Sequence, residues 1–109
     1  DRPANGSGGL ISVVVCTRDR PEILRRCLER LQQLRFASFE VIVVDNAPTT
    51  SETRGCFSNL VGADARFRYV VEPEAGLSRA RNRGLREAAG SRGPGTHPRF
   101  LFRRDTSCL

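Results

Sequence analysis

The fold is decided by the stretch Leu10-Ile-Ser-Val-Val-Val-Cys-Thr-Arg-Asp-Arg-Pro21, which joins an apolar run to a helix through a short polar turn. The run Ile11 to Val15 is mostly β-branched, which is typical of a strand buried on both faces of a parallel sheet. Asp19 can accept hydrogen bonds from the helix amides, with Glu22 placed as in a capping box, and Pro21 fits the first turn. Ligands of open α/β sheets bind at the carboxyl ends of strands. The turn is therefore a candidate ligand site, and an ordinary solvated turn is the alternative.

The same strand-and-helix pattern returns along the chain. Between residues 22 and 34 apolar residues recur at helical spacing, which predicts an amphipathic helix covering the sheet. Another amphipathic helix is predicted from Leu77 to Ala89. Strands joined by such helices are parallel, with right-handed crossovers. We therefore predict a partial three-layer, Rossmann-like α/β fold with the first strand central and the strand order 3-2-1. Its parallel strands are expected near 11–15, 41–45 and 67–71.

Composition and charge narrow the function classes. The 109 residues make one small domain or part of a larger one. The net charge is +6 and all 18 basic residues are Arg, whose planar fork suits phosphate, although general solubility is the plainer explanation. No aromatic stacking platform or known nucleic-acid motif accompanies the arginines, so a nucleic-acid-binding module is disfavoured. His97 is the only histidine, which leaves little material for a Ser-His-Asp triad or a zinc site.

The two ends of the sequence differ in composition from its middle. Residues 1–9 are rich in Gly, Asn and Pro, without the apolar core of a signal peptide, and we expect them to be disordered. Residues 91–109 are rich in Gly, Pro and Arg and are expected to form an atypical, disordered tail, although Phe100-Leu101-Phe102 could begin a fourth strand. No run approaches the length of a membrane span. We expect a cytoplasmic location, or one peripheral to the inner face of the membrane.

Polar residues follow each of the three predicted strands, and the carboxyl ends of parallel strands meet at one edge of a sheet. Hydroxyl and amide groups of the first turn could border a flat ligand, and Asn46 could offer its amide to a base. Arg79 and Arg81 add positive charge to a helix start, which favours phosphate. Each piece alone has a plainer explanation, a turn or a solvated helix face. Together they favour a nucleotide site made by Cys16, Thr17, Arg18, Asp45, Asn46, Arg79 and Arg81.

Three segments resemble the amino-terminal half of an inverting family 2 glycosyltransferase with the GT-A fold. They are residues 12–20, residues 40–47, and Gly76 to Gly84, and the last is similar to the family signature Gly-x-x-x-Ala-Arg-Asn-x-Gly. The resemblance covers roughly Ile11 to Gly90. It implies that residues 10–90 are the nucleotide-sugar-binding half of a GT-A domain.

The resemblance also implies roles for the candidate residues. The turn from Cys16 to Arg18 would line the base and ribose of a UDP-type or dTDP-type sugar nucleotide. Asn46 stands where the family usually has an acid that contacts the base. Arg79 and Arg81 would lie near the base and diphosphate, and Asn82 would tie the helix start to the first turn. The sugar would pass, with inversion, to an acceptor that the sequence does not identify.

The chain departs from the family pattern after Gly90. There the family continues with a buried strand ending in Asp-x-Asp, which binds the Mn²⁺ or Mg²⁺ that bridges the diphosphate. Here Asp105 is the only acid after Gly90 and stands beside Arg103 and Arg104. That is a poor site for a hard cation, which needs several oxygen ligands.

The family's catalytic base is also missing. We therefore expect a fragment, truncated or frame-shifted after Gly90, that binds a donor but is inactive alone and has no metal site. A non-catalytic nucleotide-binding module is the alternative.

Overall fold

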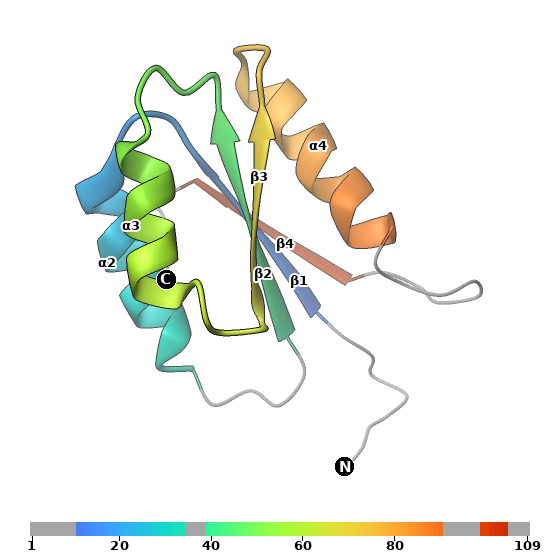
Figure 1. Ribbon diagram of the computed structural model, residues 1–109. Helices are drawn as coiled ribbons and strands as arrows, with labels where there is room; N and C mark the ends of the chain where they lie inside the picture. The colour runs from blue at the N-terminus through green and yellow to red at the C-terminus, as the bar shows by residue number, and fades with distance from the viewer. Residues whose placement is uncertain (1–10, 35–38, 91–98, 105–109) are drawn as a thin grey trace.

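The computed structural model describes residues 11–34, 39–90 and 99–104 of the chain. Within them, strands and helices alternate as β1 (Ile11–Thr17), α2 (Pro21–Gln32), β2 (Phe39–Asn46), α3 (Glu52–Val61), β3 (Phe67–Glu72), α4 (Leu77–Gly90) and β4 (Arg99–Arg104). The strands form one parallel sheet in the order β3-β2-β1-β4. Helices α2 and α3 cover one face of the sheet and α4 covers the other (Figure 1). None of the helices in the described ranges is long and apolar enough to cross a membrane.

The predicted fold class and strand order are confirmed. Strand β1 pairs with β2 from Ile11 opposite Phe39 to Thr17 opposite Asp45, so both buried runs lie in the middle of the sheet. Strand β3, the least apolar of the predicted strands, lies at the edge. The strands extend slightly beyond their predicted carboxyl ends, because β1 continues to Thr17 and β2 to Asn46. This extension brings polar residues into the end of the ladder.

Strand β4 corrects one expectation. The prediction of a disordered tail is wrong for residues 99–104, which pair with β1 from Ile11 opposite Arg99 to Cys16 opposite Arg104. An unpaired β1 edge would expose a row of backbone N–H and C=O groups, and β4 satisfies them. The side chain of Phe102 also packs against the buried cluster beneath α4. The remaining residues of the predicted tail, and the predicted disordered residues 1–9, lie outside the described residues.

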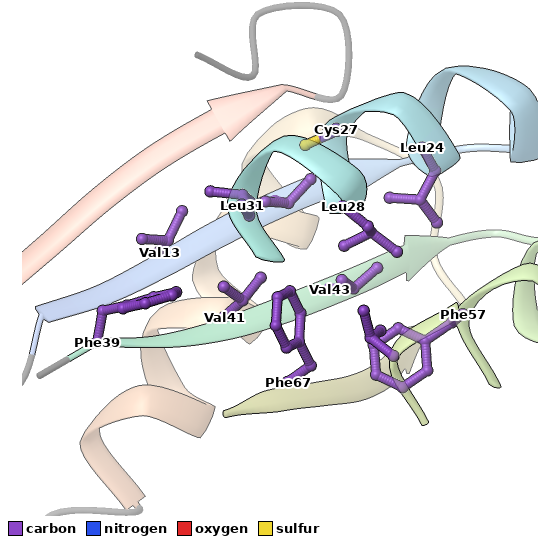
Figure 2. Packing of buried hydrophobic residues seen from close by; sticks show 12 residues of the cluster. Val13, Leu24, Cys27, Leu28, Leu31, Phe39, Val41, Val43, Phe57 and Phe67 are labelled. Atoms are coloured by element: carbon purple, nitrogen blue, oxygen red, sulfur yellow. The ribbon is translucent and has the colours of Figure 1, made fainter. Parts of the chain in front are cut away.

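The larger core fills the space between the sheet and helices α2 and α3. Leucines of α2 lie over β1 and β2, and Phe57 of α3 and Phe67 of β3 lie at the side of the same cluster (Figure 2). The predicted amphipathic helix is thus confirmed, because the face that repeats at helical spacing is the one that the sheet buries. The most buried residues of this cluster include Leu24, Leu28, Leu31, Val15, Val41, Val43 and Val61.

The second core, beneath α4, is smaller and is made of smaller residues. Ala80 and Ala88 of α4 pack against Val14, Ile42 and other side chains of β1 and β2. Gly84 is necessary in this arrangement, because a Cβ added there would lie 2.2 Å from a methyl carbon of Val14. The small side chains let α4 lie close to the sheet and bring its first turn to the ends of the strands.

Candidate functional site

A cleft of about 230 Å³ opens at the carboxyl ends of β1, β2 and β4, beside the first turn of α4. Its position is the one expected for a ligand site in an open α/β sheet. The wall formed by β1 and α4 is uncharged, and the rim is basic. The lining consists of Cys16, Thr17, Arg18, Arg20, Asn46, Gly76, Leu77, Ala80 and Arg104.

Asn46 holds one wall of the cleft together. Its side-chain Nδ2 donates hydrogen bonds to the backbone carbonyls of Glu72 (3.2 Å) and Glu74 (2.7 Å), and its Oδ1 accepts from the backbone N–H of Gly76 (3.0 Å). These partners fix the orientation of the amide, since two carbonyls require the NH₂ group. They also fix the turn between β3 and α4, where Gly76 adopts a φ of 132°. Both amide hydrogens of Asn46 are therefore committed to the backbone, and the hypothesis that they read a base is not supported by this geometry.

The turn between β1 and α2 is held by a contact that differs from the predicted one. Asp19 has a left-handed φ of 51°, and its carboxylate accepts hydrogen bonds from the Thr49 backbone N–H (3.0 Å) and hydroxyl (2.9 Å). These bonds hold the pKa of Asp19 below its usual value. The capping role predicted for Asp19 is wrong, because within the described residues the N-cap of α2 is Arg20, without a side-chain cap. Pro21 does occupy the first turn, as predicted. The carboxylate of Asp19 instead ties the β1–α2 turn, which carries Arg18 and Arg20, to the loop between β2 and α3.

Asp45 lies on the other face of the sheet from the cleft. Its side chain is completely buried, and its Oδ2 accepts a hydrogen bond of 2.5 Å from the hydroxyl of Tyr69, whose ring packs against Phe57. Within the described part of the chain its Oδ1 has no hydrogen-bond partner. Burial raises the pKa of Asp45, and the bond from Tyr69 opposes this rise. Burial and the neighbouring carboxylate raise the pKa of Tyr69. Asp45 therefore belongs to the core under α3 rather than to the cleft.

The three candidates on α4 also lie away from the cleft lining. Arg79 forms an ion pair of 2.9 Å with Glu74, and with Asn82 it lines a separate hollow of about 600 Å³ beside β3. The guanidinium of Arg81 lies over the ring of Phe102, 5.8 Å from its centroid. Of the eight candidate residues, the cleft thus brings together Cys16, Thr17, Arg18 and Asn46.

Two cleft residues that the sequence analysis missed carry charge. Arg20 lies in the segment 12–20 that carries the family resemblance, but it was not among the predicted site residues. Arg104 could have been found by extending the fourth strand that Phe100-Leu101-Phe102 indicates, because a parallel strand ends at the same sheet edge. With Arg18, three arginines are among the residues that line the cleft. The first turn of α4 adds backbone N–H groups, so this arrangement favours an anion.

The chain is similar to glycosyltransferases. The family model described as Glycosyl transferase family 2 matches residues 12–91. The chain is 32% identical over 83 residues to Glycosyltransferase GlyA of Streptococcus pneumoniae serotype 4 (strain ATCC BAA-334 / TIGR4). This match covers 74% of this chain and 12% of that protein. It is 27% identical over 82 residues to the uncharacterized glycosyltransferase EpsJ of Bacillus subtilis (strain 168), covering 75% of this chain and 24% of that protein.

A solved structure extends the similarity to three dimensions. The mannosyltransferase PcManGT from Pyrobaculum calidifontis, in complex with GDP-Man and Mn²⁺, has a TM-score of 0.64 to this chain at 25% sequence identity. The match covers 72% of this chain and 24% of that one. The chain therefore spans at most about a quarter of the length of these three relatives.

Proposed function

The chain belongs to glycosyl transferase family 2, and on this premise we propose that it is the part of a glycosyltransferase that binds the nucleotide-sugar donor. The complete protein would transfer a sugar from a nucleoside diphosphate, with inversion, to an acceptor. PcManGT, the structural relative, is in complex with a nucleotide sugar. The donor proposed here is a nucleoside diphosphate sugar of the UDP or dTDP type.

The observation that supports this proposal is the division of the cleft into an uncharged wall and a basic rim. Leu77, which is 46% exposed, lies beside the nearly buried Cys16 and Thr17 and offers an uncharged surface of the kind that a flat base and a ribose can cover. Arg18 and its basic neighbours can bind phosphate oxygens through paired, charge-assisted hydrogen bonds. A nucleotide has the same division, with an uncharged base and ribose at one end and charged phosphates at the other.

The side chains around the cleft supply groups for binding rather than for proton transfer. They are thiol, hydroxyl, amide, apolar and guanidinium groups, and no carboxylate is among the lining residues that the structure describes. We therefore propose that this chain binds the donor without turning it over. The same observation favours a second candidate function, a nucleotide-binding module without catalysis.

Isothermal titration with UDP, dTDP and GDP tests donor binding. We expect saturable binding of at least one of them, weakened about tenfold by Arg18→Gln, because a charge-assisted hydrogen bond is lost. Arg30→Gln is the matched control, since Arg30 is exposed in the last turn of α2, at the opposite end of that helix. Equal effects of the two variants, or tighter binding of a random oligonucleotide, would refute the proposal.

Turnover separates the two candidate functions. The chain is incubated with UDP-sugars in the presence of Mn²⁺, and release of UDP is followed. If UDP binds and no UDP is released from the UDP-sugars, the chain by itself is a nucleotide-binding module. Release of UDP above the rate without protein would show instead that catalytic groups are present in the chain.

A further inference from the structure

We infer that Arg104, together with Arg18 and Arg20, supplies the positive charge for the diphosphate in this cleft, so that a nucleoside diphosphate binds here without a divalent metal. The inference rests on the proposed function and specifies how the phosphate end of the ligand is held. It concerns the end of β4, where the sequence has two adjacent arginines instead of the acidic motif that the resemblance to the family implies for the next strand.

The register of the sheet places Arg104 at the cleft. Arg104 pairs with Cys16, and both residues line the cleft. Side chains alternate between the two faces of a strand, so Arg104 shares the α4 face with Phe102, which packs into the cluster beneath α4. Arg103 projects to the other face, and its Nη1 donates a hydrogen bond to the carbonyl of Phe102 (3.1 Å). Two adjacent arginines thus have different surroundings, and one of them borders the cleft.

The residues that border the cleft do not fit a divalent cation. Mn²⁺ and Mg²⁺ take carboxylate and carbonyl oxygens as ligands. Across the described ranges, no group of three or more His, Cys, Asp or Glu residues is placed to hold a metal. Asn46 Oδ1, the one side-chain amide oxygen among the described lining residues, already accepts a hydrogen bond from the backbone N–H of Gly76. Three guanidinium groups around the same space would repel a cation.

The same groups fit a diphosphate. Each guanidinium is always charged and presents donors in a planar fork that matches two phosphate oxygens. They come from the β1–α2 turn and from the end of β4, so they approach the cleft from separate elements. The β1–α2 turn is held by the bonds between Asp19 and Thr49, which limits the movement of Arg18 and Arg20. Their summed charge can offset that of a diphosphate, which is the role that a bridging metal would otherwise have.

The test compares UDP, UMP and uridine by isothermal titration, in EDTA and in Mn²⁺, using the whole chain. We expect UDP affinity in EDTA to lie within about twofold of that in Mn²⁺, and UDP to bind more tightly than uridine. Arg104→Gln should weaken UDP binding about tenfold, the equivalent of one charge-assisted contact, and leave uridine binding unchanged. Arg103→Gln removes the same charge from the adjacent residue and should change UDP binding by less than about twofold. Circular dichroism of both variants checks that the fold is retained.

The possible failures are distinguishable. If UDP binds only when Mn²⁺ is present, or if the Arg103 and Arg104 variants lose equal affinity, the inference is wrong and the proposed donor-binding function stands. If the wild-type chain binds none of the nucleoside diphosphates under either condition, the proposed function fails and the inference fails with it.

Discussion

On the face of the sheet beneath α2 and α3 the helices contribute large apolar side chains, whereas on the other face α4 contributes alanines to a smaller core that charged residues border. Leucine, valine and phenylalanine side chains interlock on the first face (Figure 2). On the second face, alanines and Gly84 let α4 approach β1. The difference indicates that the two faces have different roles. Burial of large apolar surface stabilises the domain from one side, and the close approach of a helix on the other side forms the cleft.

Hydrogen bonds and ion pairs hold α4 on the sheet, whereas packed apolar side chains hold α2 and α3 on the other face. The Ser12 hydroxyl donates to Glu40 (2.7 Å) across β1 and β2. Arg68 of β3 pairs with Glu87 of α4 (2.8 Å), and Arg83 pairs with the same carboxylate (3.1 Å). These ion pairs are partly exposed, so each contributes little to stability, but they orient α4 on the sheet. Predictions of stability and binding should therefore differ between the two faces.

The largest expected effect is on the apolar face. Leu28→Ala removes a completely buried side chain from the middle of the α2 interface and leaves a cavity. We expect the free energy of unfolding in urea to fall by about 2–5 kcal/mol. Leu77→Ala is the control, because Leu77 is 46% exposed at the start of α4, and its effect should stay within about 0.5 kcal/mol. Similar losses from the two variants would contradict the assignment of the core to α2.

The second expected effect tests the close approach on the α4 face. Gly84→Ala would place a Cβ 2.2 Å from Val14, which forces the helix away from the sheet. We expect a net loss of about 1–3 kcal/mol in thermal or urea unfolding, despite the better helix propensity of alanine. Gly55→Ala in α3 is the matched control, since a Cβ there meets no atom within 4 Å. That variant should be neutral or more stable, by up to about 1 kcal/mol. A stabilising Gly84→Ala would show that α4 lies farther from the sheet.

The sequence was informative about the fold where local patterns are long and regular. The apolar runs from Ile11 and from Val41 predicted buried parallel strands, and the spacing of the leucines in α2 predicted its buried face; all three are confirmed. Strand β4 was harder to predict, because three apolar residues in a Gly-, Pro- and Arg-rich segment carry little periodicity. It forms a strand by pairing with the edge of β1, which lies far away in the sequence, so the local pattern of residues 99–104 does not indicate this pairing.

The site was predictable in position but not in the partners of its side chains. Its location at the carboxyl edge of the sheet followed from the direction of the parallel strands alone. The partners of Asp19 and Asn46, in contrast, lie 26–30 residues away on other loops, beyond the reach of a local capping or turn pattern. The candidates on α4 were separated by helix geometry. Arg79 and Arg81 are two residues apart, so their side chains point about 200° apart around the axis, and the two contact Glu74 and Phe102 respectively.

The third prediction concerns the wall that Asn46 fixes. In Asn46→Asp, a carboxylate would replace the NH₂ group and face the carbonyls of Glu72 and Glu74, to which it has no hydrogen to donate. We expect a loss of about 1–3 kcal/mol in urea unfolding, the cost of leaving such groups unpaired. Asn59→Asp on the exposed side of α3 makes the same chemical change away from the turn and should have little effect. If both variants unfold at the same urea concentration, the bonds of Asn46 do not stabilise the fold.

The smallest expected effect is a pH dependence that originates in the core under α3. Burial raises the pKa of Asp45, so its carboxyl group holds a proton more tightly in the folded chain than in the unfolded one. The free energy of unfolding contributed by this group should therefore fall as pH rises from the unfolded pKa of about 3.9 to the raised folded value, and stay constant above it. Asp45→Asn removes this titration while keeping an oxygen that can accept from Tyr69. The amide of Asp45→Asn changes the free energy of unfolding by an amount that does not depend on pH. The slope of the free energy of unfolding against pH is therefore the quantity to compare.

Asp64 provides a control of opposite sign. Hydrogen bonds from Arg66 lower the pKa of Asp64, so the stability that this carboxylate contributes is lost as pH falls through its folded pKa. Relative to wild type, Asp45→Asn should gain stability as pH rises through the acid range, whereas Asp64→Asn should lose it. Urea unfolding at a series of pH values measures both slopes, and parallel curves for wild type and Asp45→Asn would show that Asp45 titrates normally. Such a result would mean that water reaches Asp45, and the contrast between a dry apolar face and a charged α4 face would be weaker than the structure indicates.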